Sequence, residues 1–370
     1  MNAALGSYAR TLDRTLLGLV VLLMVIGLVC AMAASPGQAA RINVDDAFRF
    51  AARQAVFAGF GLVLILGAAA LSPLAVRRAG AILFVAALAL VAFVAFFAPD
   101  VKGASRWIDF GPLALQPSEL LKPAIVIVWA WMLSEEMKKP GFPGRWIATT
   151  LYCIAATFLL LQPDVGQTAL LGATLLAMLL LSGVSWPFLA GGVVVAGVVG
   201  VALYFIEDHV RARVDAFLAS EASYQVGRAL DAISGGGVFG RGPGEGVIKR
   251  TLPDAHSDFV YAVAAEEFGL FASLGLIALF GFLAWRGLSR SSRLIDPFAQ
   301  LAASGLFTLV ALQAAIHIAV NLSLAPAKGM TLPFVSYGGS SMTGAALTLG
   351  LALALTRRRP GAHLYDGRQE

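Results

Sequence analysis

Long apolar runs separated by short polar segments dominate the chain. About ten of these runs are long enough to cross roughly 30 Å of hydrocarbon as helices. They lie near Leu16–Ala33, Ala55–Leu71, Ala79–Phe97, Leu120–Leu133, Trp146–Leu161, Gly166–Val184, Pro187–Ile206, Phe259–Trp285, Phe298–Leu322 and Gly338–Thr356. The pattern predicts an all-α polytopic membrane protein with about ten transmembrane helices.

Composition supports this class and excludes others. Hydrophobic residues make up 58% of the 370 residues and charged residues 13%, and the mean hydropathy is +0.79, which excludes a water-soluble domain. The net charge of +5 does not indicate a nucleic-acid partner, because the basic residues lie in short loops and not on one face. Cys30 and Cys153 each lie in an apolar run away from any histidine, so we expect neither a disulfide nor a zinc site. We predict a single membrane domain over residues 1–370.

The distribution of basic residues predicts the orientation. Lysine and arginine in short loops stay preferentially in the cytoplasm. With the N-terminus inside, one face collects Arg10, Arg14, Arg77, Arg78, Lys138, Lys139, Arg145, Arg286, Arg290, Arg293 and Arg357–Arg359. The opposite face has a more balanced mixture of charges. Both termini, including the polar tail 360–370, are therefore predicted to be cytoplasmic.

In this orientation a large extracytoplasmic loop, residues 207–258, joins the seventh and eighth helices. Val226, Leu230 and Ile233 are spaced i, i+4 and i+7, which predicts a short helix lying in the membrane interface, and Gly235–Gly237 end it. Glycines recur at 240, 242, 244 and 246 near three basic residues. They indicate either a backbone that approaches a phosphate closely or a flexible hinge, and the glycine pattern by itself favours the hinge.

Polar residues also mark the starts of several predicted helices. Pro117, with Glu119 three residues after Gln116, resembles a capping arrangement. Glu119 and Lys122 share one helical face and are expected to pair, either as a structural ion pair or as part of a polar cavity. Asp164 follows a second Gln-Pro pair and is typical of a helix cap.

The densest charge in the sequence lies in 241–269, directly before and within the start of the eighth helix. Asp258 precedes the apolar run, and the position alone favours an N-cap over a general base. His317 and Asn321 are spaced i, i+4 and are expected to hydrogen-bond inside the bundle, with His317 as an interior histidine and not a catalytic one. Prolines and glycines between the ninth and tenth helices predict the only broken helix junction.

Four segments together resemble the SEDS family (shape, elongation, division and sporulation). They are GASRWIDFGPLALQPSELLK (103–122), QPDVGQT (162–168), LPDAHSDFVYAVAAEEFG (252–269) and KGMTLPFVSYGGSS (328–341), in the order that the family has them. The last segment is closer to the division members of the family than to the elongation members.

The resemblance implies a peptidoglycan glycosyltransferase that polymerises lipid II, the undecaprenyl-pyrophosphate-linked disaccharide peptide. It would work at the outer face of the cytoplasmic (inner) membrane, at the division septum, with other division proteins and a class B penicillin-binding protein, an FtsI-like transpeptidase. By motif, the family's catalytic aspartate corresponds to Asp258 and its polar cavity residues to Glu119, Lys122 and Asp164. Its basic residue in the last outer loop corresponds to Lys328.

Sugar transfer requires a base for the attacking hydroxyl and positive charge for the departing pyrophosphate. Asp258 is the candidate base. The candidate substrate-binding residues are Glu119, Lys122, Asp164, Arg241, Lys249, Arg250, His256 and Lys328. No tightly bound cofactor is expected, although a divalent cation, Mg²⁺ or Mn²⁺, would assist. Direct displacement with one carboxylate would invert the linkage.

Three alternatives remain open. A lipid II flippase or transporter would use the intramembrane charges as a pathway, but only one broken junction is evident. A noncatalytic scaffold would tolerate changes at Asp258. An elongation-type polymerase would share the chemistry but not the role in division.

Overall fold

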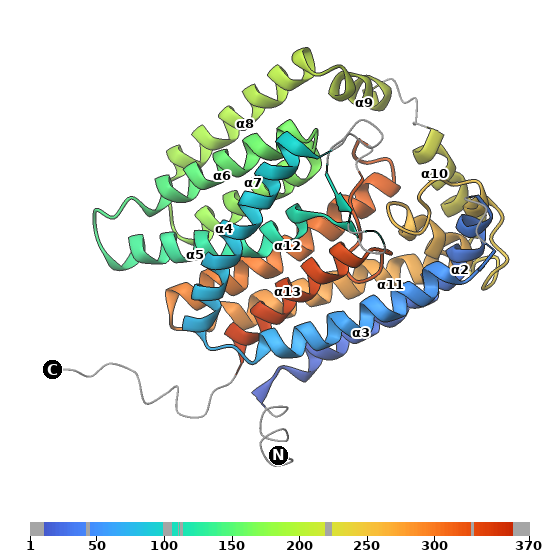
Figure 1. Cartoon of the computed structure of the whole chain (residues 1–370), viewed down its shortest axis with the longest axis horizontal. Helices are drawn as coiled ribbons and strands as arrows, with labels where there is room; N and C mark the ends of the chain where they lie inside the picture. Colours follow the sequence, from blue (N-terminus) through green and yellow to red (C-terminus); the bar gives the residue numbers. More distant parts are fainter. Residues whose placement is uncertain are drawn as a thin grey trace.

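The computed structural model describes residues 11–41, 45–98, 106–109, 111, 114–218, 224–326 and 329–357. Several residues named in the sequence prediction lie outside the described residues, namely Arg10, Lys328, Arg358, Arg359 and the tail 360–370. Within them the chain forms a bundle of long helices packed side by side (Figure 1).

The regular elements follow one another along the chain with short connections. They are α2 (Arg14–Arg41), α3 (Arg49–Ala69), α4 (Pro73–Phe97), β1 (Ile108–Asp109), β2 (Ala114–Leu115), α5 (Pro117–Lys138), α6 (Gly144–Leu161), α7 (Val165–Leu181), α8 (Trp186–Ile206), α9 (Asp208–Leu218), α10 (Tyr224–Gly236), η1 (Ile248–Arg250), α11 (Val260–Ser291), α12 (Pro297–Asn321) and α13 (Gly339–Thr356). The antiparallel pair β1–β2 is the only sheet among the described residues.

The polytopic all-α prediction is confirmed. Eight helices among the described residues are long and apolar enough to cross a membrane, namely α2, α3, α4, α6, α8, α11, α12 and α13. Helix α7 is apolar but shorter, and α5 has 22 residues with charges near both ends. The count of about ten spans adds these two helices and stays a prediction.

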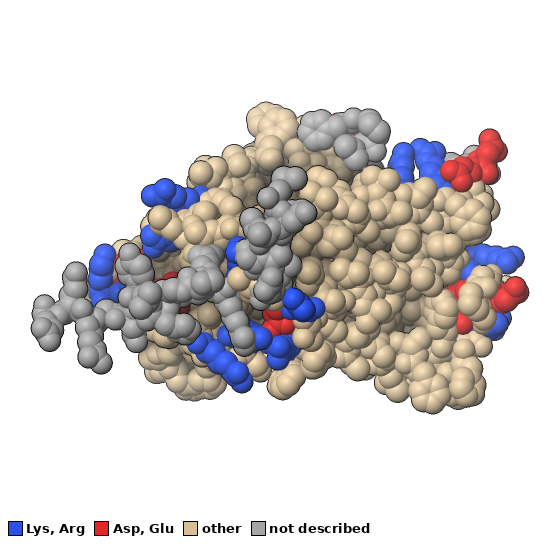
Figure 2. Space-filling view, turned by 90° about the horizontal axis from the view of Figure 1, so that it is seen from below, with Lys and Arg blue, Asp and Glu red and all other residues tan. Residues whose placement is uncertain are grey.

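The bundle has two ends of different character. We call the end where α2 begins the basic end, and the end where α2 finishes the loop end. At the basic end, Asp13 pairs with Arg286 and Arg290, and Lys138 pairs with Asp296. On the face in Figure 2 the charged side chains gather toward the two ends, and uncharged residues cover the middle. This distribution fits a protein whose middle is surrounded by lipid.

Two helices, α4 and α12, begin with a polar cap followed by proline. The Ser72 hydroxyl accepts a hydrogen bond from the backbone N–H of Ala75, and Pro73 begins α4. The Asp296 carboxylate caps α12 in the same way, and Pro297 follows it. A cap satisfies a free N–H of the first turn, and proline tolerates the first helical position because its missing N–H would have no intrahelical partner.

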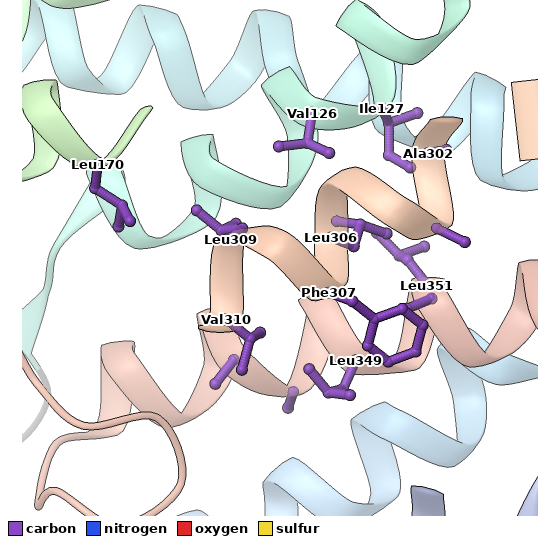
Figure 3. Packing of buried hydrophobic residues seen from close by; sticks show 14 of the residues in the cluster. Val126, Ile127, Leu170, Ala302, Leu306, Phe307, Leu309, Val310, Leu349 and Leu351 are labelled. Atoms are coloured by element: carbon purple, nitrogen blue, oxygen red, sulfur yellow. The ribbon is translucent and has the colours of Figure 1, made fainter. Parts of the chain in front are cut away.

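Helices α5 and α12 form the centre of the bundle. Figure 3 shows α12 packing Leu306, Phe307 and Leu309 between residues of α5, α7 and α13. Helix α5 contacts α4, α6, α7, α12 and α13. Helix α8, in contrast, packs mainly on α7 and α9 and is exposed along nearly its whole length. The polar groups of α5 are therefore held in the best-packed part of the molecule.

The segment 207–258 contains more structure than the sequence predicted. It includes α9, α10 and η1. The short helix predicted there is α10, but its buried face is Val226, Ala229 and Ala232, which pack with residues of α2 and α11. Of the three residues predicted to share the apolar face, Val226 is buried and Ile233 packs against this cluster, whereas half-buried Leu230 is not part of it.

Helix α11 has a break that the sequence analysis missed. Gly269 has φ 76° and ψ −167°, outside the helical region, and divides α11 into an N-terminal part and a longer C-terminal part. The carbonyl groups of Glu266 and Glu267 accept hydrogen bonds from the backbone N–H groups of Arg241 and Gly242. The glycine-rich loop therefore donates hydrogen bonds to the carbonyl groups next to the break. Breaks in the helical structure are thus not confined to the junction of α12 and α13.

Candidate functional site

Asp258 lies at the loop end, directly before α11. The N-cap residue of α11 is Phe259, and no side chain caps the helix, so the cap interpretation of Asp258 was wrong. Its backbone carbonyl accepts a hydrogen bond from Asn321 Nδ2 at 3.1 Å. Its Oδ2 atom lies 3.0 Å from where a side chain at Gly329 would begin. The aspartate is thus held by its backbone and faces the loop that follows α12.

Asn321 is the residue that fixes this position. Its side chain is fully buried, donates to the carbonyls of Asp258 and His317, and accepts from the backbone N–H of Ala262 at 3.2 Å. The expected hydrogen bonding of Asn321 inside the bundle is confirmed. His317 is also buried, with Nδ1 2.6 Å from the carbonyl oxygen of Met330.

The carboxyl group of Asp258 has an unusual environment. Burial raises its pKa to about 7, the negative charge of Asp254 contributes to the rise, and the guanidinium of Arg106 opposes it. A carboxyl group with a pKa near neutral pH is suited to accept and release a proton. Perturbed values of this kind are frequent at functional sites.

Arg106 is the site residue that the sequence analysis overlooked. It donates from Nε to the carbonyl of Gln162 at 3.0 Å and from Nη2 to that of Pro163 at 2.5 Å. From there its charge lowers the pKa of both Asp164 and Asp258. The only signal for it was its place within the family-like segment 103–122, and its spacing alone does not indicate proximity to Asp258.

Glu119 and Lys122 form the predicted ion pair inside the bundle. The Nζ–Oε1 distance is 2.8 Å and both side chains are 3% exposed. Lys122 also donates to Gln313 Oε1 at 2.9 Å, and Gln167 Nε2 donates to the same Glu119 oxygen at 3.3 Å. The pair therefore belongs to a buried polar network drawn from α5, α7 and α12.

The network continues toward the loop that contains Gly329. Gln313 Nε2 donates to the carbonyl of Thr331 at 3.0 Å, and the hydroxyls of Thr331 and Ser341 are 2.5 Å apart. Glu119 also lies against Gly344 of α13, where a side chain would meet Glu119 Oε2 at 2.9 Å. Both the network and Asp258 thus contact the segment 329–331.

Asp164 is the cap of α7, as predicted. Its Oδ1 accepts the backbone N–H of Gln167 at 3.3 Å. Burial raises its pKa, whereas Arg106 lowers it. The capping arrangement predicted at α5 was wrong in part. Pro117 does begin the helix, but the side chain of Gln116 makes no capping hydrogen bond. The backbone N–H of Gln116, which the Glu119 side chain would accept in a capping box, donates instead to Ser340 Oγ at 3.0 Å.

His256 occupies an aromatic cluster near the site. Its ring centroid is 5.0 Å from that of Phe50 and 5.1 Å from that of Tyr337. Burial lowers its pKa to about 4, although Asp254 opposes the change, so the ring is neutral at physiological pH. Its backbone carbonyl accepts from Tyr337 N–H at 2.9 Å, which ties the segment before Asp258 to the segment before α13.

The glycine-rich loop is neither an open phosphate cradle nor a free hinge. The fully buried carboxylate of Glu266 accepts backbone N–H groups from Val247, Ile248 and Lys249 at 2.7–2.8 Å. Glu267 accepts those of Gly244 and Gly246. The backbone donors therefore already hold anions, and these anions are the protein's own side chains.

The basic residues of this loop are distributed differently from the prediction. Lys249 is buried and paired with Glu267. Arg241 is exposed and donates from Nε to the carbonyl of Gly235 at 3.1 Å, and Arg250 is exposed. Their substrate-binding roles stay predictions, but Lys249 would have to leave a buried ion pair to reach a pyrophosphate.

Among the described residues no group of three or more His, Cys, Asp or Glu side chains is placed to hold a metal ion. If a divalent cation bound here, Asp258 would hold it together with oxygens of a bound substrate, which is a usual arrangement for Mg²⁺.

Comparison with known proteins gives a consistent result. The family model FtsW/RodA/SpoVE, described as cell cycle proteins, matches residues 13–360. The chain is 50% identical to the probable peptidoglycan glycosyltransferase FtsW of Caulobacter vibrioides (strain NA1000 / CB15N), over 99% of this chain and 94% of that protein. It is 35% identical to the protein of the same name from Halothiobacillus neapolitanus (strain ATCC 23641 / c2), over 92% and 85%.

Solved structures show the same fold. A chain from a study of how a peptidoglycan synthase complex coordinates polymerization and crosslinking superposes with a TM-score of 0.78 at 27% identity, covering 93% of this chain and 97% of that one. The crystal structure of the rod shape determining protein RodA from Thermus thermophilus superposes with a TM-score of 0.67 at 27% identity, covering 93% and 96%.

Proposed function

Because the chain belongs to the SEDS family of cell cycle proteins, we propose that it is a peptidoglycan glycosyltransferase that polymerises lipid II, with Asp258 as its general base. The observation that carries the assignment of the base is the position of Asp258, whose backbone is held by Asn321 and whose carboxylate faces Gly329 beside the polar network, and burial there raises its pKa to about 7.

In the proposed reaction Asp258 accepts the proton of the acceptor sugar's 4-hydroxyl. The hydroxyl oxygen forms a bond to the anomeric carbon of the donor, and the bond from that carbon to the pyrophosphate oxygen breaks. The undecaprenyl pyrophosphate leaves with the bonding electron pair, so the configuration at the anomeric carbon is inverted. A base matched to the operating pH typically contributes about 100-fold to 10,000-fold to the rate.

We propose Arg106 as a source of positive charge near the reacting groups, because its guanidinium acts on both Asp164 and Asp258. Lys122 contributes indirectly, since its ammonium donates to Glu119 and Gln313 in the buried network. Lys328 remains a further candidate by motif. Asp258 would hold a divalent cation if one bound here, and its charge would offset that of the departing pyrophosphate.

The test is the substitution Asp258→Asn in the full-length protein. Because no side-chain cap is lost and the backbone hydrogen bond to Asn321 is retained, we expect a stable protein without glycan polymerisation. Polymer length on a gel after incubation with lipid II and the crosslinking partner measures activity, and thermal unfolding in detergent checks stability. Normal polymer from a stable variant would refute the role of Asp258.

We further propose that the basic end is cytoplasmic, with about ten spans in the inner membrane and the large loop outside. The partners proposed are a class B penicillin-binding protein and other division proteins at the septum. A relative of similar fold comes from a peptidoglycan synthase complex, which supports the penicillin-binding protein as a partner.

A role in division is tested by depleting the protein from its own cells. We expect filaments, because septal wall synthesis would stop while elongation continues. Round cells would instead indicate an elongation-type polymerase and would leave the glycosyltransferase proposal intact.

A further inference from the structure

A polar pocket lies at the basic end, far from the proposed catalytic residues at the loop end. Its volume is about 230 Å³ and it lies where the start of α2 meets the ends of α11 and α13. Its lining residues are Thr11, Leu12, Asp13, Arg14, Thr15, Arg286, Arg290 and Thr356. Three arginines therefore face one aspartate, and the pocket carries excess positive charge.

Both carboxylate oxygens of Asp13 already accept hydrogen bonds from the protein. Asp13 Oδ1 accepts the backbone N–H groups of Thr15 and Leu16, which caps α2. Oδ2 accepts Arg286 Nη2 at 3.1 Å and Arg290 Nε at 2.8 Å. Burial raises the pKa of Asp13, but these hydrogen bonds and arginine charges outweigh it and hold the pKa below its usual value, so the carboxylate is ionised at neutral pH.

The arginines, in contrast, have donors to spare. A guanidinium has five N–H donors, and Asp13 accepts one hydrogen bond from each of Arg286 and Arg290. The buried Nε of Arg286 has no hydrogen-bond partner among the described residues. Arg14 is exposed beside them, and hydroxyl groups of threonines complete the lining.

We propose that this pocket binds a phosphate group, and that the phosphate belongs to the headgroup of an anionic phospholipid. Planar guanidinium groups bind phosphate oxygens by paired hydrogen bonds. Basic pockets between helices at the cytoplasmic surface are typical sites for anionic headgroups. The assignment of the phosphate to a membrane lipid rests on the proposed topology, which places the basic end at the cytoplasmic leaflet. A bound headgroup would join α2, α11 and α13 at this end.

The experiment measures lipid binding to the full-length protein by native mass spectrometry. Phosphatidylglycerol is titrated against phosphatidylcholine, and inorganic phosphate is titrated alone. The variant is Arg14→Gln/Arg290→Gln, which leaves Asp13 paired with Arg286 and should therefore fold. The control is Arg78→Gln, because Arg78 is an exposed arginine of α4 that does not line the pocket.

We expect the wild-type protein to retain phosphatidylglycerol over phosphatidylcholine, and each arginine removed to weaken that binding by about 5-fold. The control should bind like the wild type. Equal retention of the two lipids, or an equal loss in the control, would overturn the site. Binding of inorganic phosphate without any preference for phosphatidylglycerol would overturn the membrane source.

Discussion

Two acidic sites lie at opposite ends of the short N-terminal part of α11, and they have opposite environments. Asp258 precedes the helix, is half-buried, and has a pKa raised to about 7. Glu266 and Glu267 end the same segment, are fully buried, and accept five backbone N–H groups between them. The same functional group is poised to exchange a proton at one end and is satisfied by fixed donors at the other.

This difference in environment distinguishes a carboxyl group suited to catalysis from two carboxylates that stabilise the fold. A carboxylate that is surrounded by donors is stabilised in its charged form and makes a poor base, although it holds the chain firmly. A carboxylate left with few donors in a desolvated place costs stability but gains reactivity. The glutamates join the glycine-rich loop to α11, and Asp258 lies on the far side of the segment that they anchor.

The largest effect on stability should come from Glu267→Gln. This change leaves the buried Lys249 ammonium without its anionic partner, and losing one member of a buried pair typically costs about 3 to 5 kcal/mol. We expect a large fall in the thermal unfolding temperature in detergent, in contrast to Asp258→Asn. The double variant Glu267→Gln/Lys249→Met should recover much of the loss, because no unpaired charge remains.

A matched control is available in the same loop. Glu245 is exposed, so Glu245→Gln should leave the unfolding temperature nearly unchanged. If Glu267→Gln lowered the unfolding temperature no more than Glu245→Gln does, the Glu267–Lys249 pair would not stabilise the fold. The contrast between Glu267 and Asp258 would then be refuted.

The Glu119–Lys122 pair tests, inside the bundle, whether a buried carboxylate with fixed partners serves the fold or the reaction. Reversing either charge leaves two like charges side by side at 3% exposure, so we expect low protein levels. The double reversal restores the pair, but it places a cation next to the Nε2 donor of Gln167 and an anion next to Gln313 Oε1. We therefore expect restored protein level, measured by size exclusion of the solubilised protein, without restored polymerisation. Full activity would reduce the pair to a simple salt bridge.

Much of this architecture could be predicted from the sequence, because hydrophobic runs determine spans and local spacing determines pairs such as Glu119 with Lys122. The features that were missed depend on distant parts of the chain. In the sequence, the segment around Gly269 resembles an ordinary apolar helix. Only the approach of the loop shows why glycine is needed there, since a side chain at Gly269 would meet the backbone nitrogen of Gly240 at 2.4 Å.

The candidate site shows the same limit. Asp258 was identified by a family-like motif, whereas its position alone favoured a cap, which the structure does not contain. The electrostatic effect of Arg106 on Asp258 joins residues that are far apart in sequence, and no periodic pattern indicates it. Local rules therefore predicted the helices and the Asp164 cap, but tertiary contacts determine which charges meet.

The smallest and most selective effect is expected from Asp254→Asn. Asp254 has φ 50°, a conformation that asparagine adopts readily, and its backbone carbonyl, which accepts from Ser257 and Asp258, is unchanged. Its negative charge contributes to the raised pKa of Asp258, so removing it should lower that pKa. Because the base must be ionised, wild-type polymerisation should fall as the pH drops through about 7, and the variant should keep its activity to lower pH. Initial rates with lipid II across the acid and neutral range measure the shift. An acid limb that stays in place, or moves to higher pH, would show that the group titrating in the reaction is not Asp258.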